Sequence, residues 1–278
     1  MSPVEAFAAC EATVRSLDPD RYFASLFAPA CKRPLLFALY AFNHELARAS
    51  EVAREPIATE IRLQWWREAL EGAREGRPRA HPAAVGLTAI LSQDSGHGAD
   101  LESLIDARGI ESSSAPFATL AAMESHARAT SASLMRVAAR LLAGAGNMAG
   151  PIDEAGIAYG LAGMLRGSPY YAARGKLFLP FDLLGAESLS SVDVFSVSNS
   201  AKLNRVLKKI GLCAFDHLAR ARTFGVPRAL LPAVLPASLV PAYLSRLLDC
   251  ADPPRQWADV SRLRRQLILL RTALVGHL

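Results

Sequence analysis

The stretch RYFASLFAPACKRPLLFALYAFNHELARASE, residues 21–51, decides the fold of this 278-residue chain. From Pro34 to Ala53 its apolar residues recur at the spacing of one helix face, and Pro34 suits a first turn, where a missing N–H costs nothing. The spacing therefore predicts one long helix over 34–53. The sequence IRLQWWREAL at 61–70 keeps the same periodicity and predicts a second helix over 57–72.

Helical patterns continue along the rest of the chain. Further helices are expected over 83–91, 116–145, 151–165, 201–224 and 254–278. Because neighbouring side chains on a helix diverge by about 100°, one of Trp65 and Trp66 is expected in the core and the other partly exposed. Pro169 is expected to end or kink the helix over 151–165.

Composition favours helix over strand. Half of the residues (51%) are hydrophobic, aromatic residues are few (7%), and alanine and leucine are abundant. Alanine and straight-chain residues lose little freedom in a helix, whereas strands prefer β-branched and aromatic side chains. The chain is long enough for one large domain, and no repeat or linker divides it. We therefore expect a single all-α domain over residues 1–278, with roughly ten helices.

Charge and cysteine content narrow the class of protein. The net charge of +5 is spread along the chain without interleaved aromatic residues, which gives nucleic-acid binding little support. An anionic membrane surface or a phosphorylated ligand fits as well. The four cysteines lie far apart, with no CxxC or Cys/His metal spacing apparent, so a reducing compartment is expected.

The N-terminal residues predict a cytoplasmic location. Glu5, Glu11 and Asp18 lie where a signal or transit peptide would be free of acidic residues, and no apolar signal segment is present. No stretch reaches the about 18 to 20 uninterrupted apolar residues of a membrane span. Contact with the inner membrane, if it occurs, is expected to be peripheral.

Several enzyme classes lack their motifs in this sequence. A GxSxG segment, a glycine-rich phosphate loop and a Rossmann fingerprint are all missing, which removes hydrolases, nucleotide-binding proteins and dehydrogenases. His126 has no cysteine, glutamate or second histidine at metal spacing, so a zinc role is not expected for it. Ser131 and Ser133 have no adjacent base.

Two blocks carry a family resemblance. Residues 21–51, continued by 61–70, resemble the opening of squalene and phytoene synthases. The segment GIAYGLAGMLRGSPYYAARGKLFLP, residues 156–180, is similar to the second signature of that family. The resemblance implies an isoprenoid-synthase-like helical bundle around a central cavity. Members of the family join two prenyl diphosphates head to head, using a DxxxD-type cluster on each of two facing helices.

The aspartate clusters of the family are largely replaced in this chain. In such enzymes, carboxylates hold Mg²⁺ ions that neutralise the departing diphosphate. The matching positions here are Ala47 and Glu51, with Arg48 between them, and then Gly167 and Tyr171. Three of four carboxylates are lost, and Glu51 alone cannot hold the metal cluster. We therefore expect no catalytic residue, no metal and no cofactor.

Asp153 and Asp182 are acidic residues from which a metal site could be rebuilt, and Mg²⁺ is the cofactor expected if the protein is active. The wording LRGSPYYAARGKLFLP, residues 165–180, resembles a branch of the family implicated in assembling respiratory complex I. The leading hypothesis is a catalytically inactive binding scaffold in complex I assembly, with a complex I subunit as partner. The alternatives are a prenyl transferase that condenses farnesyl or geranylgeranyl diphosphate, and an isoprenoid or lipid carrier.

The candidate binding residues fall within or beside the two blocks and comprise polar and basic side chains and tyrosines. They are Tyr22, Arg33, Tyr40, Asn43, His44, Arg48, Glu51, Arg166, Tyr170, Tyr171, Arg174 and Lys176. Each group has a plainer interpretation. Arg48 would pair with Glu51 and Glu55 on a solvated helix face, the tyrosines would pack in the core, and the cluster Arg166, Arg174 and Lys176 would be ordinary surface instead of an anion site.

Overall fold

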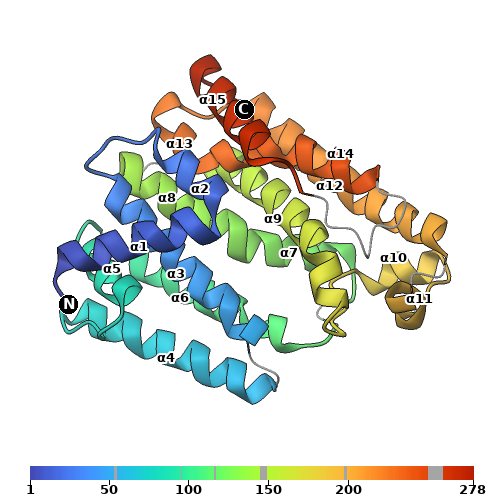
Figure 1. Ribbon diagram of the computed structural model, residues 1–278, viewed down its shortest axis with the longest axis horizontal. Coiled ribbons are helices and arrows are strands. Elements are labelled where there is room, and N and C mark those ends of the chain that lie inside the picture. Colours follow the sequence, from blue (N-terminus) through green and yellow to red (C-terminus); the bar gives the residue numbers. More distant parts are fainter. Residues whose placement is uncertain (53–54, 95, 116, 145–148, 197–198, 250–258) are drawn as a thin grey trace.

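The computed structural model describes residues 1–52, 55–94, 96–115, 117–144, 149–196, 199–249 and 259–278, without the side chains of residues 50–52 and 149. Helices joined by short connections make up this part of the chain, and it contains no strand (Figure 1). The prediction of an all-α fold is confirmed.

The helices follow one another in a simple order. They are α1 (Pro3–Leu17), α2 (Pro19–Ser25), α3 (Arg33–Val52), α4 (Pro56–Arg74), α5 (Pro82–Leu91), α6 (His97–Ala107), the 3₁₀ turn η1 (Gly109–Ser112), α7 (Leu120–Ala127), the π-helical turn η2 (Arg128–Ala132), α8 (Ser133–Ala143), α9 (Ala149–Ala172), α10 (Phe181–Ala186), α11 (Ser191–Ser196), α12 (Ser200–Phe224), the 3₁₀ turn η3 (Arg228–Leu230), α13 (Leu231–Val234), the 3₁₀ turn η4 (Leu235–Leu239), α14 (Val240–Leu248) and α15 (Arg262–Val275).

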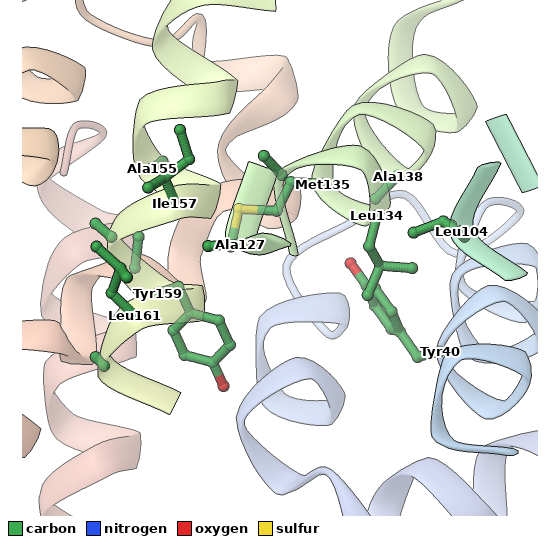
Figure 2. Close-up of a cluster of buried hydrophobic side chains, with 14 of the residues drawn as sticks. Tyr40, Leu104, Ala127, Leu134, Met135, Ala138, Ala155, Ile157, Tyr159 and Leu161 are labelled. Carbon is green, nitrogen blue, oxygen red and sulfur yellow. The ribbon is translucent and has the colours of Figure 1, made fainter. Parts of the chain in front are cut away.

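The helices form two halves with the segment α7–α8 between them (Figure 1). In the first half, α1, α3 and α5 pack on one another, and α4 covers α3, α5 and α6. In the second half, α9 packs along α12, and α14 contacts both. Figure 2 shows the buried cluster where the halves meet, with Tyr159 of α9 on one side of the α7–α8 segment and Tyr40 of α3 on the other.

The two helices predicted from the opening sequence are present. α3 spans Arg33–Val52 and α4 spans Pro56–Arg74, each within two residues of the expected bounds. Trp66 is buried against Phe42, with ring centroids 5.2 Å apart, while Trp65 is partly exposed. The expected division of the two tryptophans is therefore confirmed.

Of the two effects expected of Pro169, the end of its helix was wrong. α9 continues through Pro169 to Ala172. Proline lacks the N–H that would reach back to the carbonyl of Leu165. The hydroxyl of Ser168 donates to that carbonyl instead, at 2.8 Å. The neighbouring side chain thus satisfies the acceptor that proline leaves open, and the helix runs on.

Two other predicted bounds need correction. The single helix expected over 116–145 begins at Leu120, where the Thr119 side chain accepts from the Ala122 N–H, and it is interrupted by the π-helical turn η2. The final helix begins at Arg262 after the Ser261 cap, and residues 254–258 of the predicted range lie outside the described part of the chain. Capping side chains set both starting points.

By length and composition, the helical stretch Arg228–Leu248 meets the requirements for crossing a membrane. Within its apolar window, however, 83% is buried inside the structure. Prolines 232, 236 and 241 divide the stretch into the short pieces η3, α13, η4 and α14. The stretch packs against α8, α9 and α15. Its apolar residues therefore form part of the core of the fold.

One close contact between α9 and η2 in the core depends on a glycine. A Cβ atom added to Gly156 of α9 would lie 2.3 Å from the Cα of Ala132 in η2. Because the obstacle is backbone, it cannot rotate out of the way. The π-helical turn and α9 can therefore touch only where this position has no side chain. A Cβ atom added to Gly163, two turns further along α9, would meet no atom of a neighbouring element within 4 Å.

Alanine substitutions at these two glycines are expected to affect stability differently. Gly156→Ala is expected to lower the free energy of unfolding by about 1 to 3 kcal/mol, the usual cost of overpacking. Gly163→Ala is expected to leave it unchanged or raise it by up to about 1 kcal/mol, because alanine has the higher helix propensity. Urea denaturation of both variants checks this, and equal stability of the two would contradict the close approach.

Candidate binding cavity

A polar cavity of about 230 Å³ lies between α3, η1, the α7–η2 segment and α9. Its walls combine charged, hydroxyl and aromatic side chains with two glycines. They are Arg21, Asn43, Arg108, Glu111, His126, Thr130, Ser131, Tyr159, Gly160, Gly163, Met164, Arg166, Tyr171 and Phe178. The cavity is thus built at the junction of the two halves.

One wall of the cavity is organised around the buried carboxylate of Glu111. Arg108 donates to it at 2.7 Å, and His126 Nε2 lies 3.0 Å from the same oxygen. The other arm of the Arg108 guanidinium donates to Asn43 Oδ1 at 3.0 Å. Lys176 donates to the backbone carbonyl of Glu111 at 3.1 Å. Glu111 and Arg108 together therefore link α3, η1, α7 and the segment after α9.

The electrostatic balance keeps Glu111 ionised. Burial alone would raise its pKa, but the charge of Arg108 and the hydrogen bond from His126 outweigh burial and lower the pKa from 4.5 to about 2. The ionised carboxylate holds the Arg108 guanidinium and the His126 ring in place at the cavity wall.

The opposite wall holds a second arginine cluster. The Arg21 guanidinium pairs with Asp18 at 2.7 Å and lies over the rings of Tyr159 and Tyr40, 5.0 and 5.6 Å from their centroids. Arg166 lies over the Tyr243 ring at 3.7 Å. Cation–π contacts of this kind hold a guanidinium in place when little solvent is available.

Four buried polar atoms of the lining have no hydrogen-bond partner among the described residues. They are Arg108 Nε, His126 Nδ1, Ser131 Oγ and Arg166 Nε. Buried polar atoms are nearly always satisfied, by protein or by ordered water. Two of these four are guanidinium N–H donors, so the cavity suits water or a small ligand that offers acceptor oxygens.

The residues present do not fit a Mg²⁺–diphosphate site. At the second motif position, the ring of Tyr171 lies so close to Gly167 that a Cβ there would be 2.8 Å from it. The same ring stacks on Phe178, with centroids 4.0 Å apart and an interplanar angle of 10°. Ala47 offers no carboxylate, and the side chain of Glu51 lies outside the described part of the chain.

The other acidic residues considered for a rebuilt metal site are engaged elsewhere. Asp153 forms ion pairs with Arg136 and Arg128. Asp182 accepts from the backbone N–H of Leu120 at the start of α7. Neither residue lines the cavity, so the described carboxylates do not converge on a replacement site for Mg²⁺ there.

The structure brings together only part of the predicted binding set. Asn43, Arg166 and Tyr171 line the cavity, and Lys176 contacts its wall through Glu111. Tyr40 is buried behind Arg21.

Other predicted residues lie away from the cavity lining. Tyr22 stacks on Phe37, and Arg33 donates to the carbonyl of Ala28. Arg174 covers the ring of Tyr170, 3.6 Å from its centroid.

The predicted binding residues His44 and Arg48 of α3 do not line the cavity. Arg48 pairs with Glu45 at 3.5 Å and lines a separate crevice with Trp65, Trp66 and His81. The expected ion pair of Arg48 with Glu51 lies outside the described side chains. Among the residues that the structure describes, Arg48 forms no ion pair with Glu55. His44 is half-buried, and burial lowers its pKa.

Sequence reasoning missed the residues that organise the cavity. Arg108 and Glu111 lie in a connection after α6, where nothing in the local pattern distinguishes them from solvated loop residues. His126 was considered only as a metal ligand. Glu111 meets Lys176 across 65 positions of sequence, and such a meeting becomes visible only once the chain is folded.

Comparison with known proteins identifies the family. The model of the squalene/phytoene synthase family matches residues 14–264, so the chain belongs to this family. Among solved structures, a dehydrosqualene synthase superposes with a TM-score of 0.76 at 16% identity, covering 98% of this chain and 97% of that one. A squalene synthase from Alicyclobacillus acidocaldarius gives 0.70 at 19% identity, covering 98% and 94%. At these identities the likeness establishes the isoprenoid-synthase-like fold.

Within the family, the chain is similar to proteins named for complex I assembly. The bovine and human proteins named NADH dehydrogenase (ubiquinone) complex I, assembly factor 6 are each 28% identical over 244 residues, 86% of this chain and 72% of theirs. The Dictyostelium discoideum homologue is 23% identical over 244 residues, 84% of this chain and 67% of its own. These relatives confirm the resemblance to complex I assembly proteins that residues 165–180 indicated.

The Glu111 cluster predicts a pH dependence of stability. Because the pKa of Glu111 is lowered on folding, its stabilising contribution is fully present above about pH 4.5 and is lost as pH falls toward about 2. The stability difference between wild type and Glu111→Gln is expected to shrink by about 3 kcal/mol across this window. Chemical denaturation at several pH values measures it. Glu11→Gln, at an exposed position of α1, is the matched control, and a pH-independent difference for Glu111→Gln would contradict the assignment.

Proposed function

We propose that this chain is a catalytically inactive member of the squalene/phytoene synthase family that serves as a binding scaffold in the assembly of respiratory complex I. The observation that carries the proposal is the replacement of the metal-binding positions. Gly167 and Tyr171 occupy the second motif, and the Tyr171–Phe178 stack takes up space beside them. Without carboxylates at these positions, Mg²⁺ cannot bridge a departing diphosphate.

The similar proteins support the assembly role. The relatives from Bos taurus, Homo sapiens and Dictyostelium discoideum carry complex I assembly in their names, and the similarity extends over most of this chain. A complex I subunit or assembly intermediate is therefore the proposed partner. The proposed scaffold has the helical fold of the family, and polar and charged side chains contribute to the walls of its cavity.

The cavity gives less support to an isoprenoid or lipid carrier. Its volume of about 230 Å³ is below the roughly 300 to 1,000 Å³ of typical ligand sites. Arg108, Glu111 and Arg166 line it, and these charged groups would lose hydration against an alkyl chain without compensation. A compact polar ligand suits these walls better than a prenyl chain.

Contact with the cytoplasmic face of the inner membrane forms part of the proposal. α15 exposes leucines along its outer face, together with arginines that are also exposed. The leucines are Leu263, Leu267, Leu270 and Leu274, and the arginines are Arg262, Arg264 and Arg271. A helix with apolar and basic residues on its solvent side suits the surface of an anionic bilayer.

Vesicle sedimentation tests the membrane contact. The wild-type protein is expected to sediment with vesicles of anionic phospholipid, and Leu267→Asp is expected to remain in the supernatant, because a carboxylate at this position opposes burial in the interface. Leu212→Asp, at another exposed leucine on α12, is the matched control. Equal sedimentation of all three proteins would contradict the role of α15.

A deletion strain tests the assembly role. Loss of the gene is expected to lower the amount of assembled complex I and its NADH oxidation activity, measured on native gels and in membranes. Expression of the wild-type chain restores both. Glu51→Gln, which removes the only carboxylate left at the four motif positions, is expected to restore them equally, because the role does not depend on metal-assisted chemistry.

Two outcomes would overturn the proposal. Normal levels of assembled complex I in the deletion strain would remove the assembly role. Pyrophosphate release by the purified protein from farnesyl or geranylgeranyl diphosphate with Mg²⁺, abolished by Glu51→Gln, would identify a working prenyl transferase.

A further inference from the structure

A second polar cluster lies outside the cavity, where α7, α9 and α12 meet. Glu124 of α7 accepts from two side chains of α12: Cys213 Sγ lies 2.8 Å and His217 Nε2 lies 3.0 Å from the same carboxylate oxygen. The three atoms all lie within 4.8 Å of one another. Because Cys213 and His217 are four residues apart, they project from one face of their helix toward Glu124.

We propose that Cys213, His217 and Glu124 form a Zn²⁺ site that links α7 to α12, with a water molecule as fourth ligand. Thiolate, imidazole and carboxylate are the three side-chain ligand types of protein zinc sites. Ligand atoms in a tetrahedral zinc site are separated by about 3.4 to 3.6 Å, so Cys213 Sγ and His217 Nε2, which now lie 2.8 and 3.0 Å from the Glu124 oxygen, would each have to move about 0.4 to 0.7 Å away from it. The mixture of sulfur, nitrogen and oxygen favours zinc over the hard cations Mg²⁺ and Ca²⁺.

The surroundings of His217 supply the second support for a metal. Its other ring nitrogen, Nδ1, lies 2.6 Å from a carboxylate oxygen of Glu154, and the same oxygen accepts from Arg220 Nε at 2.7 Å. A histidine that binds zinc through one nitrogen typically donates from the other to a carboxylate, which orients the ring. This carboxylate is already in place on α9, and it is itself held by an arginine.

Zinc binding changes the protonation of His217 and Cys213. Arg220 Nη2 also lies 2.6 Å from Nδ1, so the metal-free imidazole can accept there while its Nε2–H donates to Glu124. Zinc at Nε2 requires the tautomer in which Nδ1–H donates to Glu154, so the Arg220 Nη2 donor would have to move away from Nδ1. The Cys213 thiol loses its proton to solvent as the Zn–S bond forms.

The thiol of Cys213 is held in its protonated form. Burial and the neighbouring Glu124 raise the pKa of the thiol to about 12. A metal ion that binds the thiolate must displace this proton. His217 is buried, while Glu124 and Cys213 are partly exposed, which leaves a route for the ion and for the water ligand from the solvent side.

Cobalt substitution of the full-length protein tests the site. Metal-free wild-type protein is expected to bind one Co²⁺ with a thiolate-to-cobalt charge-transfer absorption, and Zn²⁺ is expected to displace it. Cys213→Ala is expected to lose the absorption. Cys31→Ala, at an exposed cysteine, is the matched control and is expected to keep it. An identical absorption in Cys213→Ala would overturn the proposal.

Two further measurements separate metal binding from loss of folding. Glu154→Gln is expected to keep the absorption while its Zn²⁺ affinity falls about 10- to 100-fold, because only the orientation of His217 is weakened. Calorimetry of wild type in buffers of different ionisation enthalpy is expected to show proton release on ion binding, because the Cys213 thiol must ionise. If folded wild-type protein binds no Co²⁺ or Zn²⁺ at a one-to-one ratio, the site does not exist, whatever the variants do.

Discussion

The buried carboxylate of Asp20 is the interaction on which the assembly of the helices depends. Only 4% of this residue is exposed, and it accepts hydrogen bonds from Tyr159, Tyr243 and Arg265. A buried charge costs several kcal/mol unless it is paired and hydrogen-bonded. Since these partners lie 139, 223 and 245 positions away in sequence, α2 can bury Asp20 only when α9, α14 and α15 have reached their places.

This constraint extends to the cavity through α9. Tyr159, fixed by Asp20, presents its ring to Arg21 on the cavity wall. One turn earlier, Gly156 brings α9 against η2, and later in the same helix Arg166 and Tyr171 reach the other lining positions. One helix thus carries the family's second motif, the contact with the chain ends and much of the cavity.

Much of the fold could be predicted from the sequence, because helix periodicity is a local signal. α3, α4 and α12 follow directly from apolar spacing, and the two motif blocks indicated the family. Pro169 misled the prediction because a single hydroxyl, that of Ser168, compensates for the missing donor. Glu111 and the Cys213–His217 pair were missed for another reason. Their partners come from distant helices, and sequence spacing alone does not reveal such encounters.

The short helix α7 carries residues of both polar sites. Glu124 faces the cluster on α12, and His126, two residues later and about 200° around the helix, faces the cavity through Glu111. A displacement of α7 toward one site is therefore a displacement away from the other. Thermodynamic linkage makes such a relation reciprocal. A cavity ligand whose affinity depends on the position of α7 would therefore act on the Cys213 cluster, and a metal bound at that cluster would act on the cavity by the same free energy.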